Sequence, residues 1–155
     1  MSYQRKKILA AAVELYLQDG LDGFSMRKLA KQIGVTAPAL YRHYDGKEHL
    51  LADGMRGAHR AFISYVYKAI EAPTPLERFV RAGQGFLDFA LEHPRWHVIL
   101  YFGPEDLGMV ELPADIEAMS GARHQFWIDR VRECMDAGIL KEGDPTQTGL
   151  TMWAH

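Results

Sequence analysis

Apolar residues recur every three or four positions along most of this chain, which is the spacing of one face of an α-helix. The segment after Ser25 shows it clearly, with apolar residues at i, i+3, i+4 and i+7: Met26, Leu29, Ala30 and Ile33. Serine is among the residues that best cap the free N–H groups at a helix start. The pattern therefore predicts a short amphipathic helix that begins directly after Ser25.

A second helix follows after a very short turn. Gly34 ends the first helix, because a residue without a Cβ adopts the left-handed helix-end conformation at little cost. Thr36 is placed to cap the next helix, and Pro38 falls in its first turn, where a missing N–H costs nothing. Two helices joined by so tight a turn form a helix-turn-helix, whose second helix is suited to enter the major groove of DNA.

The rest of the chain continues with helical spacing, and no stretch alternates with period two for long enough to make a sheet. The predicted segments are a long helix over 47–72, a helix over 76–92, a short apolar segment over 96–102, a loop over 103–108, a long helix from 113 or 115 to 136, and a last segment over 146–155. The predicted class is all-α, with a three-helix helix-turn-helix domain followed by a C-terminal helical bundle.

Composition and length narrow the class of protein. The 155 residues suffice for one or two small domains, and 48% hydrophobic with 25% charged residues is ordinary for a globular protein. No apolar run approaches the roughly 18 residues that span a bilayer, and the N-terminal segment lacks a signal-peptide pattern. Cys134 is the only cysteine, which excludes an internal disulfide and favours a reducing cytosol. We therefore expect a cytoplasmic protein with no membrane partner.

The net charge of −2 conceals an asymmetry along the chain. Residues 1–48 hold eight Lys or Arg against five Asp or Glu, a net charge of +3, which leaves −5 for the remainder. A basic region on an acidic body is expected when only that region meets phosphate. The asymmetry favours DNA as a partner of residues 1–48, the alternative being a chance asymmetry in a helical protein.

The second helix and its surroundings carry suitable side chains for DNA contact. Small residues at its start let the backbone approach the groove floor, and the free N–H groups there attract phosphate. We expect Tyr41 to be exposed and Tyr44 to be part of the core. Ala37 and Pro38 are expected to touch base edges, and the other side chains to hold phosphates. The predicted DNA-binding residues are Arg27, Thr36, Ala37, Pro38, Tyr41, Arg42, His43 and Lys47.

Residues 5–51 resemble the DNA-binding domain of the TetR/AcrR family of bacterial transcriptional regulators. The matching segments are the opening helix of the chain (5–16), the glycine turn (20–27), the helix-turn-helix core (29–35), and LYRHY (40–44) with KEHLL (47–51). Family members often carry a lysine or polar residue and a glycine where this chain has Pro38 and Ala39, so the operator sequence is not carried over.

The resemblance implies a DNA-binding domain over 1–47 and an effector-binding and dimerisation domain over 48–155. It also implies a homodimeric, ligand-responsive regulator, a repressor released from its double-stranded DNA operator by a small-molecule effector, without a cofactor. The terminus, residues 150–155, resembles the start of the penultimate helix of such proteins. The chain is then either truncated at the C-terminus, which is the alternative that we favour, or forms its dimer differently, and both alternatives put the usual family dimer in doubt.

The second domain is rich in aromatic residues, which can line a cavity for a small molecule. The alternative for each of them is plain core packing. The candidate ligand-binding residues are Phe62, Phe86, Phe89, Trp96, Phe102, Phe126 and Trp127.

Other chemistries find little support in the sequence. His93 and His97 have a spacing that can bind metal on a helix, but Pro94 intervenes and no third ligand is evident. The same histidines with Glu92 are the only candidate acid–base cluster, so we expect no metal site and no enzymatic activity. The remaining alternative is a helical protein-interaction module that uses the helix-turn-helix only as a scaffold.

Overall fold

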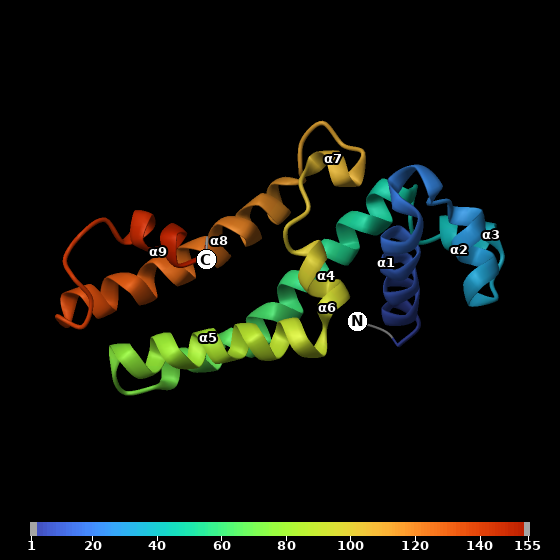
Figure 1. Cartoon of the computed structure of the whole chain (residues 1–155). Helices are drawn as coiled ribbons and strands as arrows, with labels where there is room; N and C mark the ends of the chain where they lie inside the picture. The colour runs from blue at the N-terminus through green and yellow to red at the C-terminus, as the bar shows by residue number, and fades with distance from the viewer. Residues whose placement is uncertain (1–2, 154–155) are drawn as a thin grey trace. The chain divides into compact units, whose positions relative to one another are not determined.

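A computed structural model describes residues 3–153 of the chain. All regular secondary structure within this range is helical, as Figure 1 shows, and the predicted all-α class is confirmed. Among these described residues, no helix combines the length and the apolar character that a membrane crossing requires.

The chain forms two compact units. The first unit contains the chain up to His59 together with His93–Glu117, and the second contains Arg60–Glu92 together with the chain from Ala118 onward. Two helices, α4 (Lys47–Val66) and α8 (Ala114–Asp136), contribute residues to both units. The functional domains expected over 1–47 and 48–155 stay a prediction.

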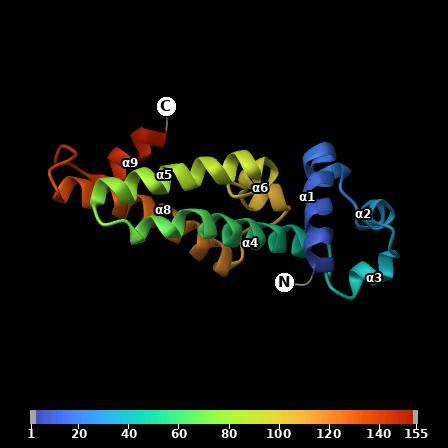
Figure 2. The same ribbon diagram turned by 90° about the horizontal axis from the view of Figure 1, so that it is seen from below.

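The first unit is built around the N-terminal helices, which lie together in Figure 2. It contains α1 (Tyr3–Gly23), α2 (Met26–Ile33), α3 (Ala37–Tyr41), the start of α4, α6 (Pro94–Ile99) and α7 (Pro104–Leu107). α2 packs against both α1 and α3, and α6 packs against α1. Leu9 of α1, Leu29 of α2 and Leu40 of α3 are at most 1% exposed, so apolar burial holds these three helices together.

Charged side chains connect further elements of the first unit. Arg95 of α6 lies 3.1 Å from Glu14 of α1, measured from Nη1 to Oε1. Arg56 of α4 donates from Nε to Oδ2 of Asp115 at 2.6 Å and from Nη2 to Oδ1 at 2.9 Å. The hydrogen bonds from Arg56 lower the pKa of the Asp115 carboxyl.

The second unit contains the end of α4, the 3-10 helix η1 (Tyr67–Glu71), α5 (Pro75–Glu92), most of α8, and α9 (Pro145–Trp153). α5 packs along η1. α5 also approaches the end of α4 closely at Gly85, where a Cβ atom would lie 2.5 Å from the carbonyl oxygen of Tyr65. The two backbones therefore touch at this point, which only glycine permits.

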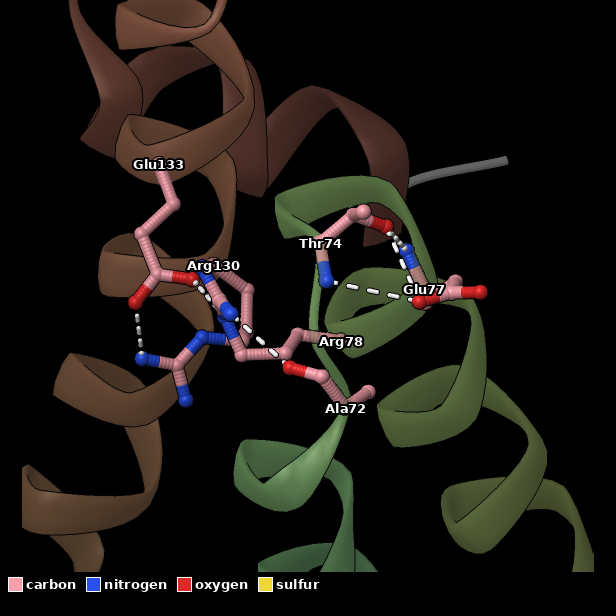
Figure 3. A network of polar contacts seen from close by, with 6 residues as sticks. All are labelled: Ala72, Thr74, Glu77, Arg78, Arg130 and Glu133. Atoms are coloured by element: carbon pink, nitrogen blue, oxygen red, sulfur yellow. Dashed lines mark hydrogen bonds and ion pairs between the residues drawn. The ribbon is translucent and has the colours of Figure 1, made fainter.

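Two polar arrangements secure α5 within the second unit, and both are drawn in Figure 3. A capping box opens the helix, because the Glu77 N–H donates to Thr74 Oγ1 at 3.3 Å and the Thr74 N–H donates to Glu77 Oε2 at 3.3 Å. Arg78 then donates from Nε to Glu133 Oε2 at 2.8 Å, while Arg130 donates to Glu133 Oε1 at 2.6 Å. Burial alone would raise the pKa of Glu133, but the hydrogen bonds from the two arginines lower it.

Three segments differ from the sequence prediction. The long helix expected over 47–72 is α-helical only to Val66 and then tightens into η1, as helix ends often do. The loop expected over 103–108 contains α7, because Pro104 fits a first helical turn and Asp106 Oδ2 accepts a hydrogen bond from the Gly103 N–H at 2.8 Å. The last segment begins at Pro145, and residues 154–155 of its expected range lie outside the described residues.

The remaining elements match their predictions closely. α5 and α8 each lie within one or two residues of the expected ranges 76–92 and 113 or 115 to 136, and α6 occupies the start of the expected apolar segment. Proline and the caps set these boundaries, which is why the sequence alone located them.

Candidate nucleic-acid interface

The helix-turn-helix forms at the predicted residues. Ser25 caps α2, since its Oγ accepts a hydrogen bond from the Lys28 N–H at 3.1 Å. Gly34 ends α2 with φ 74°, and the next N–H, that of Val35, reaches back to the Ala30 carbonyl at 3.0 Å. This is the helix ending that a left-handed glycine makes possible. The turn to α3 is therefore specified by local chemistry, and both predicted signals are confirmed.

The start of α3 differs in one detail from the sequence prediction. Thr36 occupies the N-cap position in an extended conformation, but its side chain makes no capping hydrogen bond. A cap normally bonds the N–H of the second or third helical residue. The second is Pro38, which has no N–H, and the third is Ala39, whose N–H donates to the Thr36 carbonyl at 3.0 Å. The Thr36 hydroxyl group is therefore not used to cap α3.

The outer side of α3 is open to solvent. Tyr41 is 52% exposed, whereas Leu40 and Tyr44 are 1% and 3% exposed and belong to the core. The predicted contrast between the two tyrosines is confirmed. His43 is also exposed, so the helix and the residues after it present polar groups outward.

The predicted DNA-binding residues fall into two groups by exposure. Six are exposed: Arg27, Thr36, Pro38, Tyr41, Arg42 and His43. Ala37 and Lys47 are half-buried, and Lys47 Nζ donates to the Leu21 carbonyl at 3.1 Å, which ties the start of α4 to α1. All eight lie in the first unit, on α2, on α3 and its flanking residues, and at the start of α4. Their roles toward DNA stay a prediction.

A buried carboxylate anchors the segment after α3, and sequence reasoning missed it. Asp53 of α4 is 3% exposed. Its Oδ2 accepts from Arg5 Nε and from the Tyr44 hydroxyl, both at 3.0 Å, and its Oδ1 accepts from Arg5 Nη2 at 2.9 Å. The Asp53 side chain thus connects α1, α4 and the end of the recognition segment, by which we mean residues 37–44, that is α3 and the three residues after it. The sequence did contain a signal for this buried carboxylate, because Asp53 follows the apolar Leu50 by three positions and so lies on the same, buried side of the helix.

The electrostatics of this network follow from burial. The pKa of Tyr44 rises to about 12, first because burial disfavours its charged form and then because of the nearby Asp53 carboxylate. The hydrogen bond to Asp53 raises the pKa of Arg5 further above its usual value. Tyr44 and Arg5 therefore keep their protons at any physiological pH.

A cleft of about 370 Å³ lies beside this network. It is lined by Gln4, Arg5, Ile8, His43 and Tyr44. The first three come from the first turns of α1, and the other two directly follow α3. The cleft therefore adjoins the exposed recognition segment, and no sequence pattern indicated it.

The candidate ligand-binding aromatics are divided between the two units. Five pack together in the second unit through edge-on ring contacts, among them Phe62 with Phe89 at 5.5 Å between centroids and Phe126 with Trp127 at 5.7 Å. The fifth, Phe86, lies 6.2 Å from both Phe62 and Trp127. Two belong to the first unit: Trp96, whose ring covers Gly57, and Phe102, whose centroid is 4.9 Å from that of Tyr16. Any ligand-binding role stays a prediction.

The described residues offer little for metal chemistry. Among residues 3–153, no group of three or more His, Cys, Asp or Glu side chains is placed to hold a metal ion. His93 precedes α6 with a non-helical backbone, while His97 lies within that helix. The two histidines therefore do not share one helix face, and this agrees with the prediction made from the position of Pro94 between them.

Comparison with known proteins identifies relatives of this fold. Residues 8–53 match the family model for bacterial regulatory proteins of the tetR family. Over 47 residues, 30% of this chain and 22% of the relative, the chain is 43% identical to Tetracycline repressor protein class D from Escherichia coli. Over 94 residues, 60% of this chain, it is 29% identical to an uncharacterized HTH-type transcriptional regulator, YobS, from Bacillus subtilis (strain 168). The chain spans about half the length, 49%, of that relative.

A solved structure covers nearly the whole chain. The crystal structure of AibR in complex with isovaleryl coenzyme A and operator DNA matches with a TM-score of 0.83 and 22% sequence identity, covering 97% of this chain and 82% of that chain. At this level of identity the match establishes the fold, an N-terminal helix-turn-helix domain followed by a helical domain.

Proposed function

We propose that this chain is a ligand-responsive repressor of the tetR family of bacterial regulatory proteins that binds a DNA operator. The match of residues 8–53 to the family model supports the proposal. The observation that carries the proposal is the exposed face of α3, with Tyr41 and His43 directed outward from a region of positive charge. A face of this kind is what a recognition helix needs to enter a major groove.

The proposed contacts divide into two kinds. Exposed cations and hydroxyl or imidazole groups hold phosphates and set the register of the protein on the duplex. Ala37 and Pro38 at the start of α3 touch base edges or a thymine methyl group. Two copies of the chain form a homodimer, whose recognition helices enter successive major grooves roughly 34–36 Å apart. A repressor of this kind acts on chromosomal DNA in the cytoplasm and has no catalytic role.

The proposed effector is a small molecule that binds in the second unit, near the packed aromatic residues. The crystal structure of AibR, which has the same fold, contains isovaleryl coenzyme A together with operator DNA, and this supports a small-molecule effector for this chain. α4 and α8 both contribute residues to the two units, and α4 directly follows the helix-turn-helix, so α4 is the proposed element through which binding in one unit reaches the other. The effector releases the operator only if it binds the DNA-free state better than the DNA-bound state.

The test begins with selection of fragments of the source genome that the chain binds. Affinity for a selected fragment is then measured for the parent, for Tyr41→Ala and for a matched control, Tyr67→Ala. Tyr67 is a similarly exposed tyrosine, at 59% against 52% for Tyr41, and lies in η1 of the second unit. We expect Tyr41→Ala to bind about tenfold more weakly, a loss of about 1.4 kcal/mol. We expect Tyr67→Ala to bind like the parent, and both variants to keep the parent's melting temperature.

The salt dependence gives an independent measurement. The logarithm of the affinity should fall linearly with the logarithm of the salt concentration, by about 0.9 for each neutralised phosphate. Equal binding by the parent and Tyr41→Ala would refute the role of Tyr41. A parent that selects no fragment at low salt would refute the proposed function and favour a protein-interaction module.

A further inference from the structure

The cleft beside the recognition segment has the composition of a phosphate-binding site. Its lining includes a guanidinium group from Arg5, an amide from Gln4 and an imidazole from His43. Arginine, glutamine and polar side chains of this kind supply most contacts to the DNA backbone. Ile8 and Tyr44, both buried, form its apolar part.

The Arg5 guanidinium is held in place by the buried Asp53. The carboxylate takes the Nε and Nη2 donors at 3.0 and 2.9 Å. The guanidinium group has five N–H donors in a rigid plane, so two bonds to one carboxylate fix its orientation. The Arg5 side chain is nevertheless 51% exposed. A cation whose position is already fixed loses little entropy when an anion binds to it.

Further cations lie close in sequence to the residues that line the cleft. Lys6 and Lys7 follow Arg5 along α1 and are exposed, as is Arg42, which precedes His43. These cations contribute to the net charge of +3 over residues 1–48, which favours the approach of phosphate from solution.

We infer that this cleft binds a phosphate group of the DNA backbone, beside the major groove that α3 enters. Gln4 and Arg5 of α1 then add backbone contacts to those expected from α2, α3 and the start of α4. The inference rests on the proposed function, because the ligand is the operator's own phosphate. It commits to DNA as the source of the phosphate and extends the interface to the first turn of the chain's first helix.

Gln4 is the residue to change, because it is exposed and lies outside the Arg5–Asp53 ion pair. Gln4→Glu brings a negative charge to the cleft, and Gln4→Lys brings a positive one. The matched controls are Gln147→Glu and Gln147→Lys, which make the same changes of net charge at an exposed glutamine of the second unit. All four variants should keep the parent's far-ultraviolet circular dichroism and melting temperature.

Binding of the full chain to a selected operator fragment is measured by fluorescence anisotropy over a range of salt concentrations. We expect Gln4→Glu to bind about fourfold more weakly at low salt and Gln4→Lys about fourfold more tightly, the effect of one charge about 5 Å from a phosphate in water. The salt slope of Gln4→Lys should steepen by up to about 0.9. The two Gln147 variants should match the parent in both quantities.

The outcomes separate the inference from the proposed function. If the parent binds the operator but the Gln4 variants behave like the Gln147 variants, the cleft takes no phosphate and the proposed function stands. If the parent binds no operator, the proposed function fails and the inference fails with it. Inorganic phosphate is titrated into the DNA-free chain in parallel. A Gln4-dependent affinity for inorganic phosphate without a change in DNA affinity would make the cleft a site for a free anion, which overturns the inference.

Discussion

Replacing Gly85 with alanine tests how closely α5 approaches the end of α4. A Cβ atom at this position would lie 2.5 Å from the carbonyl oxygen of Tyr65 and 2.9 Å from its carbonyl carbon. Both atoms belong to the backbone, so they cannot rotate away as a side chain would. The two helices must therefore separate to admit the methyl group. Gly83 lies two residues earlier in α5, and a Cβ atom there would have nothing within 4 Å.

The two substitutions should change stability in opposite directions. Overpacking a core position costs about 1–3 kcal/mol, and contact with rigid backbone places Gly85→Ala near 3 kcal/mol. Alanine is a better helix former than glycine by about 1 kcal/mol, and this gain applies at both positions. The net expectation is a loss of about 2 kcal/mol for Gly85→Ala and a gain of up to about 1 kcal/mol for Gly83→Ala.

Thermal unfolding followed by circular dichroism measures the difference. For a chain of this length, 1 kcal/mol corresponds to about 2–4 °C in melting temperature, so the two variants should differ by roughly 6–12 °C. Urea unfolding gives the same comparison at constant temperature. If Gly85→Ala proves as stable as Gly83→Ala, α5 does not touch the backbone of α4, and the packing inferred for the second unit is wrong.

Three further substitutions test the polar contacts by urea unfolding. Ser25→Ala removes the cap of α2 and should cost about 1 kcal/mol; an unchanged midpoint would contradict the cap. Asp53→Asn should cost about 2–3 kcal/mol, because it removes a charged acceptor, whereas Tyr44→Phe should cost about 1 kcal/mol; equal losses would contradict the network. Glu133→Gln should cost about 1–3 kcal/mol at neutral pH. Because folding lowers the pKa of Glu133, this stabilisation is present above its unfolded pKa of about 4.3 and is lost as the pH falls through the folded value, so variant and parent should converge in acid. A difference in stability between variant and parent that stays constant down to low pH would contradict the stabilising role of the Glu133 charge.

Features specified over a few residues were predictable without coordinates. The cap at Ser25, the left-handed Gly34 and the proline-bounded start of α5 depend on chemistry within one helical turn. The exposure of Tyr41 against the burial of Tyr44 followed from the helix-turn-helix context and from the burial habits of tyrosine. Most of the candidate DNA-binding residues were proposed from such local features and from the resemblance of residues 5–51 to a known domain, and their roles stay a prediction.

Features that join distant residues were not predictable. Arg5 and Asp53 are 48 positions apart, and in the sequence each looks by itself like an ordinary charged residue of a helix. The cleft beside His43 exists only because α1 packs next to the segment after α3. The 3-10 turn after Val66 was also missed, since the apolar spacing continues through it without a break.

The sequence by itself determined the all-α class, the helix-turn-helix and most helix boundaries, because caps, prolines and apolar spacing act on neighbouring residues. Only the tertiary structure decided which buried charges find partners, which glycine is a point of contact between backbones, and that the N-terminal turns of α1 border the recognition segment. The physical reason is that a side chain's environment depends on which elements pack against it, and packing brings together residues that no local pattern connects.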